Sequence, residues 1–400
     1  DLVIDVSGKY IIPGLMDANV HLDFGLTPEY LFGFENRFEE LILEGAQVAL
    51  RSGVTTVFDT WGPRAPLVKV RDAINANEMQ GSRMFVAGNI IGMGGPTSGD
   101  FFPQIRGVIS AKEAARIDAI WEQGVGPDLL WRTPSQVRKA VRDYIASGSV
   151  DFVKYLGSGH TQMQFIAFSS DAQRAIVEEA HRAGFTVQAH TTSPESLRME
   201  MDAGADLLQH CDVSGLEPIP EETIQLIVAR RLPCAALIFT ERHLAWSDQH
   251  APEIMKPITR VKDENDRRLI GAGAVLLLTT DAGLLGPKAV DNPLIGGPIG
   301  DAPDSPTKLG EAHVLWLREA IERGMSPMDA LLAATRNIAR AYHKADELGT
   351  IERGKRADLV ILDANPLENP DHYKRVVDVY KDGVRVDRSA LPTRHIMTAP

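Results

Sequence analysis

Short apolar runs alternate with longer helical patterns along most of the chain. Each run is rich in apolar or β-branched residues and is followed by a turn and then by apolar residues at helical spacing, a pattern typical of βα units around a parallel sheet. The runs are Leu15–His21, Thr55–Asp59, Met84–Gly88, Phe152–Tyr155, Thr186–His190, Leu207–His210, Cys234–Ile238 and Val275–Thr280. Eight such units predict an α/β protein built on a closed, TIM-like (β/α)8 barrel.

Several of the intervening helices have recognisable ends. A capping residue followed by proline, which is favoured at the first helical position, marks three of them: Thr133-Pro134, Ser193-Pro194 and Ser326-Pro327. Segments 35–52 and 170–183 carry apolar residues at the spacing of one helix face. These segments are expected to surround the strands.

The two ends of the chain follow a different pattern. Leu2–Val6 and Ala357–Leu362 are short strand patterns, and Val376–Tyr380 and Val384–Val386 flank the turn pair Asp382-Gly383. The first and last segments could pair into a small β unit outside the barrel, or they could cap its bottom. Both arrangements are compatible with the sequence.

The charge balance narrows the range of partners. The chain has 400 residues and a formal net charge of −12, with scattered acidic residues, which argues against a nucleic-acid partner or an anionic membrane surface. Its two cysteines are too few for a disulfide framework, and no apolar stretch reaches the roughly 18 residues of a membrane span. We therefore expect a soluble cytoplasmic protein. The chain opens with Asp1 rather than Met, within a strand pattern, which leaves open whether residues precede it.

Side chains that can bind metal ions stand where the predicted strands end. They are Asn19, His21, Lys154, His190, His210 and Asp281. Asn19 and His21 are two residues apart, so on a strand their side chains face the same side. Because catalytic groups of such barrels lie at the carboxyl ends of the strands, these six side chains are expected to converge.

Each of these residues has an ordinary explanation when taken alone. A histidine beside an apolar run is usually a hydrogen-bonded structural residue, Asp281 could cap a turn, and Lys154 could be a paired surface cation. Five strand ends that each carry such a group favour a metal site instead. Imidazoles and a carboxylate bind zinc and similar divalent transition-metal ions, and a bound ion activates water. A buried, neutral lysine could react with CO₂ to give a carbamate, an anionic oxygen ligand.

Three motifs together resemble the amidohydrolase superfamily, and the resemblance covers nearly the whole chain. Pro13-Gly14-Leu15-Met16-Asp17, followed by Asn19-Val20-His21, is similar to its first-strand motif, and Thr279-Thr280-Asp281-Ala282-Gly283 to its eighth-strand motif. The segment from Leu348 to Val360 resembles the stretch where that family re-enters an accessory β-sandwich. The resemblance implies a metal-binding barrel of residues 13–344 and an accessory β-sandwich of residues 1–12 and 345–400.

Carried over position by position, the resemblance implies a role for each candidate ligand. Lys154 would be carboxylated and bridge two metals, and His190 and His210 would be ligands. Asp281 would be both a ligand and the proton acceptor, while His21 would belong to the second metal position. One or two divalent ions are expected, zinc by default, with cobalt, manganese or iron as alternatives.

Asn19 departs from the family motif, which has histidine at this position. An amide oxygen is a weaker ligand than imidazole, so a single tightly held ion becomes plausible. An Asn-x-His opening is similar to that of the phenylurea hydrolases and the molinate hydrolase. It implies an enzyme that uses metal-activated water to cleave the C–N or C–S bond of an apolar urea, carbamate or amide, rather than a peptide bond.

The expected mechanism assigns further residues. Asp281 would accept the proton of the attacking water and return it to the leaving nitrogen. His243, or failing that Tyr155, would stabilise the oxyanion. Aromatic residues in a cleft suit a small apolar or aromatic substrate. The residues expected to contact it are Phe24, His160 and Trp246.

Two other functions remain open at this stage. A prolidase-like dipeptidase or N-acyl-amino-acid hydrolase would need a cation such as Arg242 or Arg106 to hold a substrate carboxylate. A binding or scaffolding protein that has lost catalysis would explain the missing ligand at Asn19, but it has no need of Asp281 and Lys154. Because large barrels of this kind often assemble, we also expect a homo-oligomer.

Overall fold

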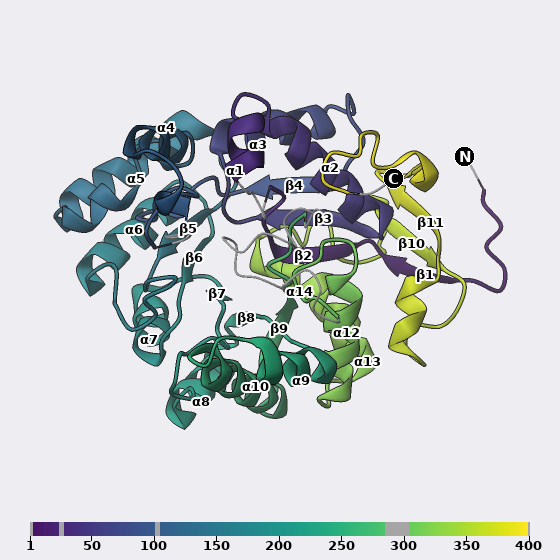
Figure 1. The fold of residues 1–400 in the computed structure, drawn as a ribbon. Coiled ribbons are helices and arrows are strands. Elements are labelled where there is room, and N and C mark those ends of the chain that lie inside the picture. Colours follow the sequence, from purple (N-terminus) through teal and green to yellow (C-terminus); the bar gives the residue numbers. More distant parts are fainter. Residues whose placement is uncertain (1–2, 24–27, 101–104, 285–303, 399–400) are drawn as a thin grey trace.

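A computed structural model describes residues 3–23, 28–100, 105–284 and 304–398. Eight parallel strands form a barrel that helices surround (Figure 1). The strands are β2 (Leu15–Val20), β3 (Val54–Asp59), β4 (Arg83–Val86), β5 (Val153–Leu156), β6 (Val187–His190), β7 (Leu208–Gln209), β8 (Pro233–Ala236) and β9 (Val275–Leu278). Each overlaps one of the eight predicted runs, so the predicted barrel is confirmed.

Two seams close the barrel. Strands β2–β3–β4 form one hydrogen-bonded sheet and β5 to β9 form another. At the first seam the Ile91 amide donates to the Lys154 carbonyl at 2.9 Å, and at the second the Asp281 amide donates to the Asn19 carbonyl at 2.9 Å. Both seams therefore run past candidate site residues, and barrel closure fixes their backbones.

The helices follow the strands in the expected order. They are α1 (Pro28–Gly33), α2 (Phe38–Arg51), α3 (Arg64–Asn75), α4 (Ala111–Glu122), α5 (Pro134–Gly148), α6 (Ser170–Arg182), α7 (Pro194–Ala203), α8 (Glu221–Arg230), α9 (Glu241–His250), α10 (Met255–Gly271), α12 (Ala312–Glu322), α13 (Pro327–Ala333) and α14 (Arg336–Ala341). Thr133, Ser193 and Ser326 cap α5, α7 and α13 through their hydroxyls, as predicted. Among the described residues, no helix has the length and hydropathy needed to cross a bilayer.

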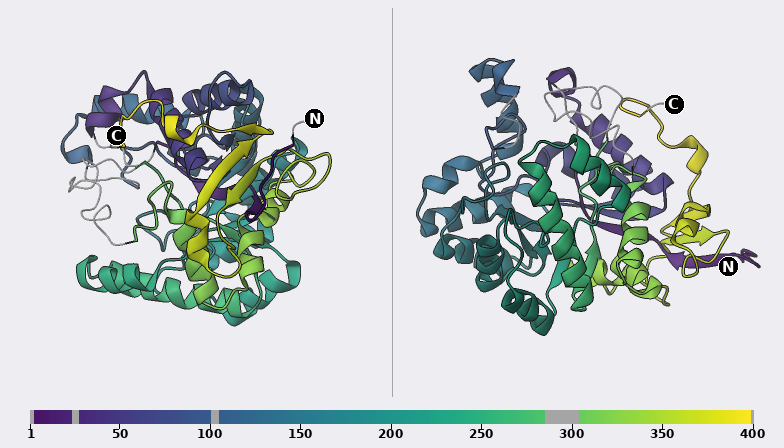
Figure 2. Two further views of the ribbon diagram at one scale, coloured as in Figure 1. Left: turned by 90° about the vertical axis from the view of Figure 1, so that its right-hand side faces the viewer. Right: turned by 60° about the horizontal axis from the view of Figure 1, so that its bottom comes forward.

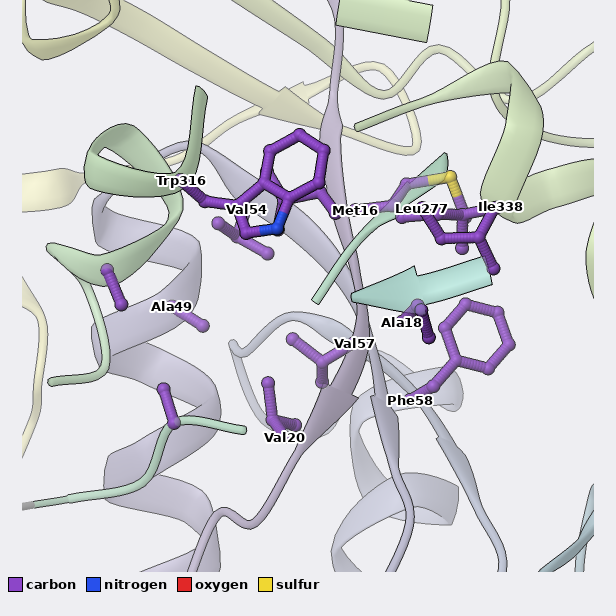
Figure 3. Packing of buried hydrophobic residues seen from close by; sticks show 14 of the residues in the cluster. Met16, Ala18, Val20, Ala49, Val54, Val57, Phe58, Leu277, Trp316 and Ile338 are labelled. Carbon is purple, nitrogen blue, oxygen red and sulfur yellow. The ribbon is translucent and has the colours of Figure 1, made fainter. Parts of the chain in front are cut away.

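Apolar side chains of the strands and the helices form one main core. Figure 3 shows Met16 of β2, Val57 of β3 and Leu277 of β9 among the side chains of Trp316 on α12 and Ile338 on α14. All five are buried, and apolar surface removed from water stabilises a fold by roughly 25 cal/mol per Å². Helices from the far end of the chain thus pack directly behind the first strand.

The two ends of the chain pair beside the barrel, as expected. A four-stranded antiparallel sheet contains β1 (Tyr10–Pro13), β10 (Leu359–Leu362), β11 (Val376–Lys381) and β12 (Val384–Arg385) in that order. In Figure 1 this sheet lies at the right-hand side of the barrel, and Figure 2 (left) shows it facing the viewer. Its strands alternate in direction, in contrast to the parallel strands of the barrel.

The first strand of this sheet lies later than the sequence pattern indicated. The prediction placed it at Leu2–Val6, but the described residues 3–6 belong to no strand, and Tyr10–Pro13 pairs instead. A turn at Ser7 and Gly8, where Gly8 has a φ of +74°, separates the two stretches. Alternation alone cannot place a strand, because a partner must be within reach. The domain boundaries after residues 12 and 344 remain predictions, and β1 continues through the first.

Candidate functional site

The six predicted metal ligands lie in or just after barrel strands; Lys154 is the second residue of β5, and the others stand near or just beyond the carboxyl ends. Five of them are buried, namely Asn19, His21, Lys154, His190 and His210. The Asp281 side chain keeps 29% of its surface exposed. Asp281 is therefore the most exposed of the six side chains.

A chain of hydrogen bonds links four of these strand ends. The Lys154 ammonium donates to the Thr60 hydroxyl at 3.0 Å, and that hydroxyl donates to the Asn19 side-chain oxygen. The Asn19 amide nitrogen then donates to Asp281 at 2.6 Å, and the same carboxylate oxygen lies 3.0 Å from His21 Nε2. Both polar atoms of Asn19 are thus engaged with protein groups.

Three imidazoles stand side by side at the ends of β5, β6 and β7. The ring of His190 lies 5.3 Å from that of His160 and 5.0 Å from that of His210. Burial lowers the pKa of all three, and for His210 it lowers the pKa to about 4. These rings are therefore neutral near pH 7, which is the form that binds metal ions.

Lys154 and Asp281 carry the unusual charges of the site. Burial lowers the pKa of Lys154 to about 8, although the Asp281, Asp59 and Glu200 carboxylates oppose the shift. Burial works to raise the pKa of Asp281, but His210, His21 and Lys154 outweigh it and hold that pKa well below its usual range. The site thus combines an ionised carboxylate with an amine that is easily deprotonated.

Two of the candidate residues have a strained backbone. His210 has a φ of +54° and Asp281 a φ of +55°, in the left-handed region that residues with a side chain rarely adopt. Histidine and aspartate are among the residues that tolerate it best. Such strain persists only where the surrounding structure imposes it, and it concentrates at functional sites.

The donor set fits a divalent ion in its chemistry. His190 Nε2 and His210 Nδ1 are buried and have no hydrogen-bond partner among the described residues, although buried polar atoms are normally paired. No three His, Cys, Asp or Glu side chains in the described part of the chain are arranged to hold an ion by themselves. An ion held by His190 and His210 would therefore need a further ligand of another kind.

Tyr155 does not belong to this site, which corrects its predicted role as a donor to the oxyanion. Its hydroxyl donates to the side-chain oxygen of Gln173 on α6 at 3.0 Å, and its ring lies in the apolar cluster between the barrel and that helix. Neighbouring residues of a strand point to opposite faces. With Lys154 facing the barrel interior, Tyr155 must face outward.

This placement predicts a structural effect for Tyr155→Phe. The substitution leaves the Gln173 oxygen without its buried donor, so the free energy of unfolding should fall by about 1–3 kcal/mol. Any catalytic turnover should stay within about twofold of the wild type, because the lost hydroxyl bonds Gln173 on α6 and not a candidate ligand. Urea denaturation and steady-state kinetics measure both quantities; a large fall in kcat at unchanged stability would contradict the placement.

The remaining predicted residues lie in different surroundings. His160 joins the imidazole row, and its backbone amide is held by Asp100 at 3.1 Å. His243 and Trp246 both lie on α9, and their ring centroids are 5.9 Å apart. Phe24 lies outside the described residues.

Sequence reasoning missed two polar side chains that organise the site. Thr60 links Lys154 to Asn19, and it directly follows β3, so the strand-end rule would have found it had hydroxyls been considered. Asp17 accepts from the Thr280 hydroxyl at 2.6 Å and ties β2 to β9. Burial raises the pKa of Asp17 to about 7. Asp17 stands two residues before Asn19 on β2, so the alternation of a strand would have placed it on the same face.

Comparisons with known proteins agree with this geometry. A structure of molinate hydrolase superposes with a TM-score of 0.93 at 39% identity, covering 99% of this chain and 87% of the other. Phenylurea hydrolase B gives a TM-score of 0.92 at 36% identity, covering 99% and 89%. Ochratoxinase of Aspergillus niger is 26% identical over 397 residues, covering 93% of this chain and 75% of the relative. The model of the amidohydrolase family matches residues 10–386, and the chain belongs to that family.

Proposed function

We propose that this protein is a metal-dependent hydrolase that cleaves the C–N or C–S bond of an apolar urea, carbamate or amide, with phenylureas and thiocarbamates as the first candidates. The strand-end donor set carries the proposal, because it combines neutral imidazoles, an ionised carboxylate and a buried lysine. The similarity to molinate hydrolase and phenylurea hydrolase B over almost the full chain supports the substrate class. We also propose that the protein is cytoplasmic and forms a homo-oligomer.

Lys154, His190 and His210 would hold the metal ion. Each of the two imidazoles has a buried nitrogen that lacks a partner among the described residues, and Lys154 would contribute as a carbamate. His21 and Asn19 flank a second position, but their polar atoms are engaged with Trp61, Thr60 and Asp281. One ion per chain is therefore the favoured stoichiometry, zinc by default, with cobalt, manganese or iron as alternatives.

Asp281 is the group placed to move protons. A bound divalent ion supplies Lewis acidity, which polarises a carbonyl and acidifies water. Asp281, ionised and partly exposed, accepts the proton of the attacking water as the new C–O bond forms. It then delivers that proton to the departing nitrogen or sulfur as the C–N or C–S bond breaks. Asn19 and His21 hold the carboxylate in place during both transfers.

Two histidines are candidates for contact with the substrate. His160 lies beside His190 and so borders the proposed metal position, where it would contact the substrate rather than the ion. His243, packed against Phe239 and Trp246, is the remaining candidate for stabilising the oxyanion. Trp246 would contribute an apolar contact to an aromatic substrate.

Metal analysis combined with a substrate screen tests the proposal. Purified protein should contain about one divalent ion per chain and should hydrolyse uncharged phenylureas or thiocarbamates faster than N-acyl amino acids. Protein without metal that stays inactive after reconstitution would instead support the scaffold alternative.

The dipeptidase alternative lacks its expected cation among the two arginines considered. Arg106 donates to the Thr97 carbonyl at 2.7 Å and contacts Asp118 at 3.4 Å. Arg242 is 72% exposed and lies 3.9 Å from Asp304. Neither arginine is a buried, free cation at the site, which argues against a dipeptidase. Activity on acyl-prolines that exceeds activity on phenylureas would overturn our choice of substrate class.

The Asn19→His variant tests the stoichiometry. Imidazole is a better ligand than an amide for borderline metals, so the metal content should rise from about one towards about two ions per chain. Elemental analysis after dialysis against excess metal measures the ratio. An unchanged ratio would mean that Asn19 serves to orient Asp281 and Thr60 and that a second ion is excluded for another reason.

A further inference from the structure

A hollow lies at the opposite end of the barrel from the candidate site. It has a volume of about 520 Å³ and is bordered by residues just before or at the start of β8 and β9, and by α13 and α14. Because all barrel strands are parallel, the amino-terminal ends that border this hollow face away from the carboxyl ends that carry Asp281 and the imidazoles. The hollow is therefore separate from the hydrolytic site.

Three arginines line this hollow, namely Arg231, Arg336 and Arg340. None of them forms an ion pair with a carboxylate of the described residues, whereas most other arginines do, as Arg323 does with Asp263 at 2.6 Å. The pKa of Glu352 is lowered mainly by its hydrogen bond with Thr350; the charge of Arg340 adds to this effect, but Arg340 and Glu352 form no ion pair. In a chain of net charge −12, a gathering of unpaired guanidinium groups is unexpected.

The acidic residues of the hollow already have partners. Asp206 accepts from the Val187 amide at 2.7 Å and lies 2.8 Å from His181 Nε2. Asp329 accepts from the Ser326 hydroxyl at 2.6 Å. Two engaged carboxylates thus face three guanidinium groups, and the hollow keeps an excess of positive charge.

Arg336 provides a second, independent sign of a missing acceptor. Its Nε is buried and has no hydrogen-bond partner in the described parts of the chain. Buried donors are normally paired, and an unsatisfied one is costly. An anion bound in the hollow would supply acceptor oxygens to this group.

We propose that this hollow binds an organic phosphate. A guanidinium group pairs with phosphate through two parallel hydrogen bonds, and a phosphate dianion offers enough oxygens and charge to engage more than one arginine, unlike a single carboxylate. The volume falls in the range of small-molecule sites and exceeds the space that an inorganic phosphate needs. The remainder of the ligand would lie against Ile270 and Met325, which also line the hollow.

Titration of the purified full-length chain with phenyl phosphate, and in parallel with benzoate, tests the proposal. Isothermal titration calorimetry should show saturable binding of phenyl phosphate at one site per chain, with benzoate about tenfold weaker or more. Arg336→Gln and Arg340→Gln should each weaken binding by about tenfold or more, because each removes a charged donor. Arg340 is exposed, so its variant is expected to fold even if that of Arg336 does not.

Arg353→Gln is the matched control, since Arg353 is an exposed arginine outside the hollow. Its affinity for phenyl phosphate should match that of the wild type. The proposal is overturned if neither compound binds saturably, if benzoate binds as tightly as phenyl phosphate, or if folded Arg340→Gln keeps the wild-type affinity. The last outcome would place the phosphate elsewhere on the chain, for example at the hydrolytic site.

Discussion

The Asp281→Asn variant is expected to lose turnover by a factor of about 10²–10⁴ while keeping its fold and its metal content. The amide oxygen can still accept hydrogen bonds from Asn19 and His21, whose donors lie 2.6 Å and 3.0 Å from the carboxylate. Asparagine also tolerates the left-handed backbone, which has a φ of +55° at this position. What disappears is the charge and the ability to accept a proton. Steady-state kinetics and elemental analysis of the same preparation measure both effects.

Asp382→Asn provides a matched control for this substitution. Asp382 is also an aspartate in the left-handed region, with a φ of +51°, but it lies in the accessory sheet and pairs with Arg83 at 2.7 Å. Its variant should keep turnover near the wild-type value, even if its stability falls. Robust turnover in Asp281→Asn would refute the proton-transfer role. Parallel loss of metal and activity would show that Asp281 acts chiefly as a ligand.

The barrel could be predicted because its physical causes are local. Strands buried on both faces appear as apolar runs, and the helices between them begin at capping residues such as Thr133 and Ser193. The edge strand of the accessory sheet was misplaced because its identity depends on a distant partner. Tyr10 pairs with Leu362, a contact between residues at opposite ends of the chain that no local pattern encodes.

The candidate site could be predicted as far as the carboxyl ends of the strands could be located in the sequence. His190, His210 and Asp281 were found because each follows an apolar run and can bind a metal. The inclusion of Tyr155 beside Lys154 was avoidable, since adjacent strand residues cannot both face the barrel interior. Thr60 was missed for a different reason, because a hydroxyl acquires its role only from the Lys154 and Asn19 side chains that it joins.

Two buried lysines of this chain show why Lys154 in particular is suited to carboxylation. Lys262 lies 2.9 Å from both Asp212 and Asp266, and although burial works to lower its pKa, the two carboxylates outweigh it and raise that pKa. Among the described residues, Lys154 has only the Thr60 hydroxyl as a direct partner, and burial lowers its pKa to about 8. At pH 7 about one Lys154 side chain in ten would be neutral, against about one in several thousand for an unperturbed lysine. Only the neutral amine reacts with CO₂.

The Lys154→Met variant is therefore expected to lose both the carbamate and the activity. In protein equilibrated with ¹³C-labelled bicarbonate, the wild type should show a carbamate carbon signal in its NMR spectrum, and the variant should lack it. Turnover should fall by about 10²–10⁴, since a bound ion contributes several kcal/mol to the stabilisation of the transition state and the variant removes one of its three proposed ligands. Elemental analysis should show a matching loss of metal.

Lys262→Met separates this chemical role from the general effect of removing a buried lysine. It leaves Asp212 and Asp266 without their shared cation, so the free energy of unfolding should fall by about 3–5 kcal/mol. The carbamate signal should nevertheless persist in the folded fraction, because Lys262 is held charged and does not react. If the signal survives in Lys154→Met and vanishes in Lys262→Met, the assignment of the carboxylated lysine is wrong. If neither the wild type nor any variant shows it, Lys154 is not carboxylated and the proposed ligand set is wrong.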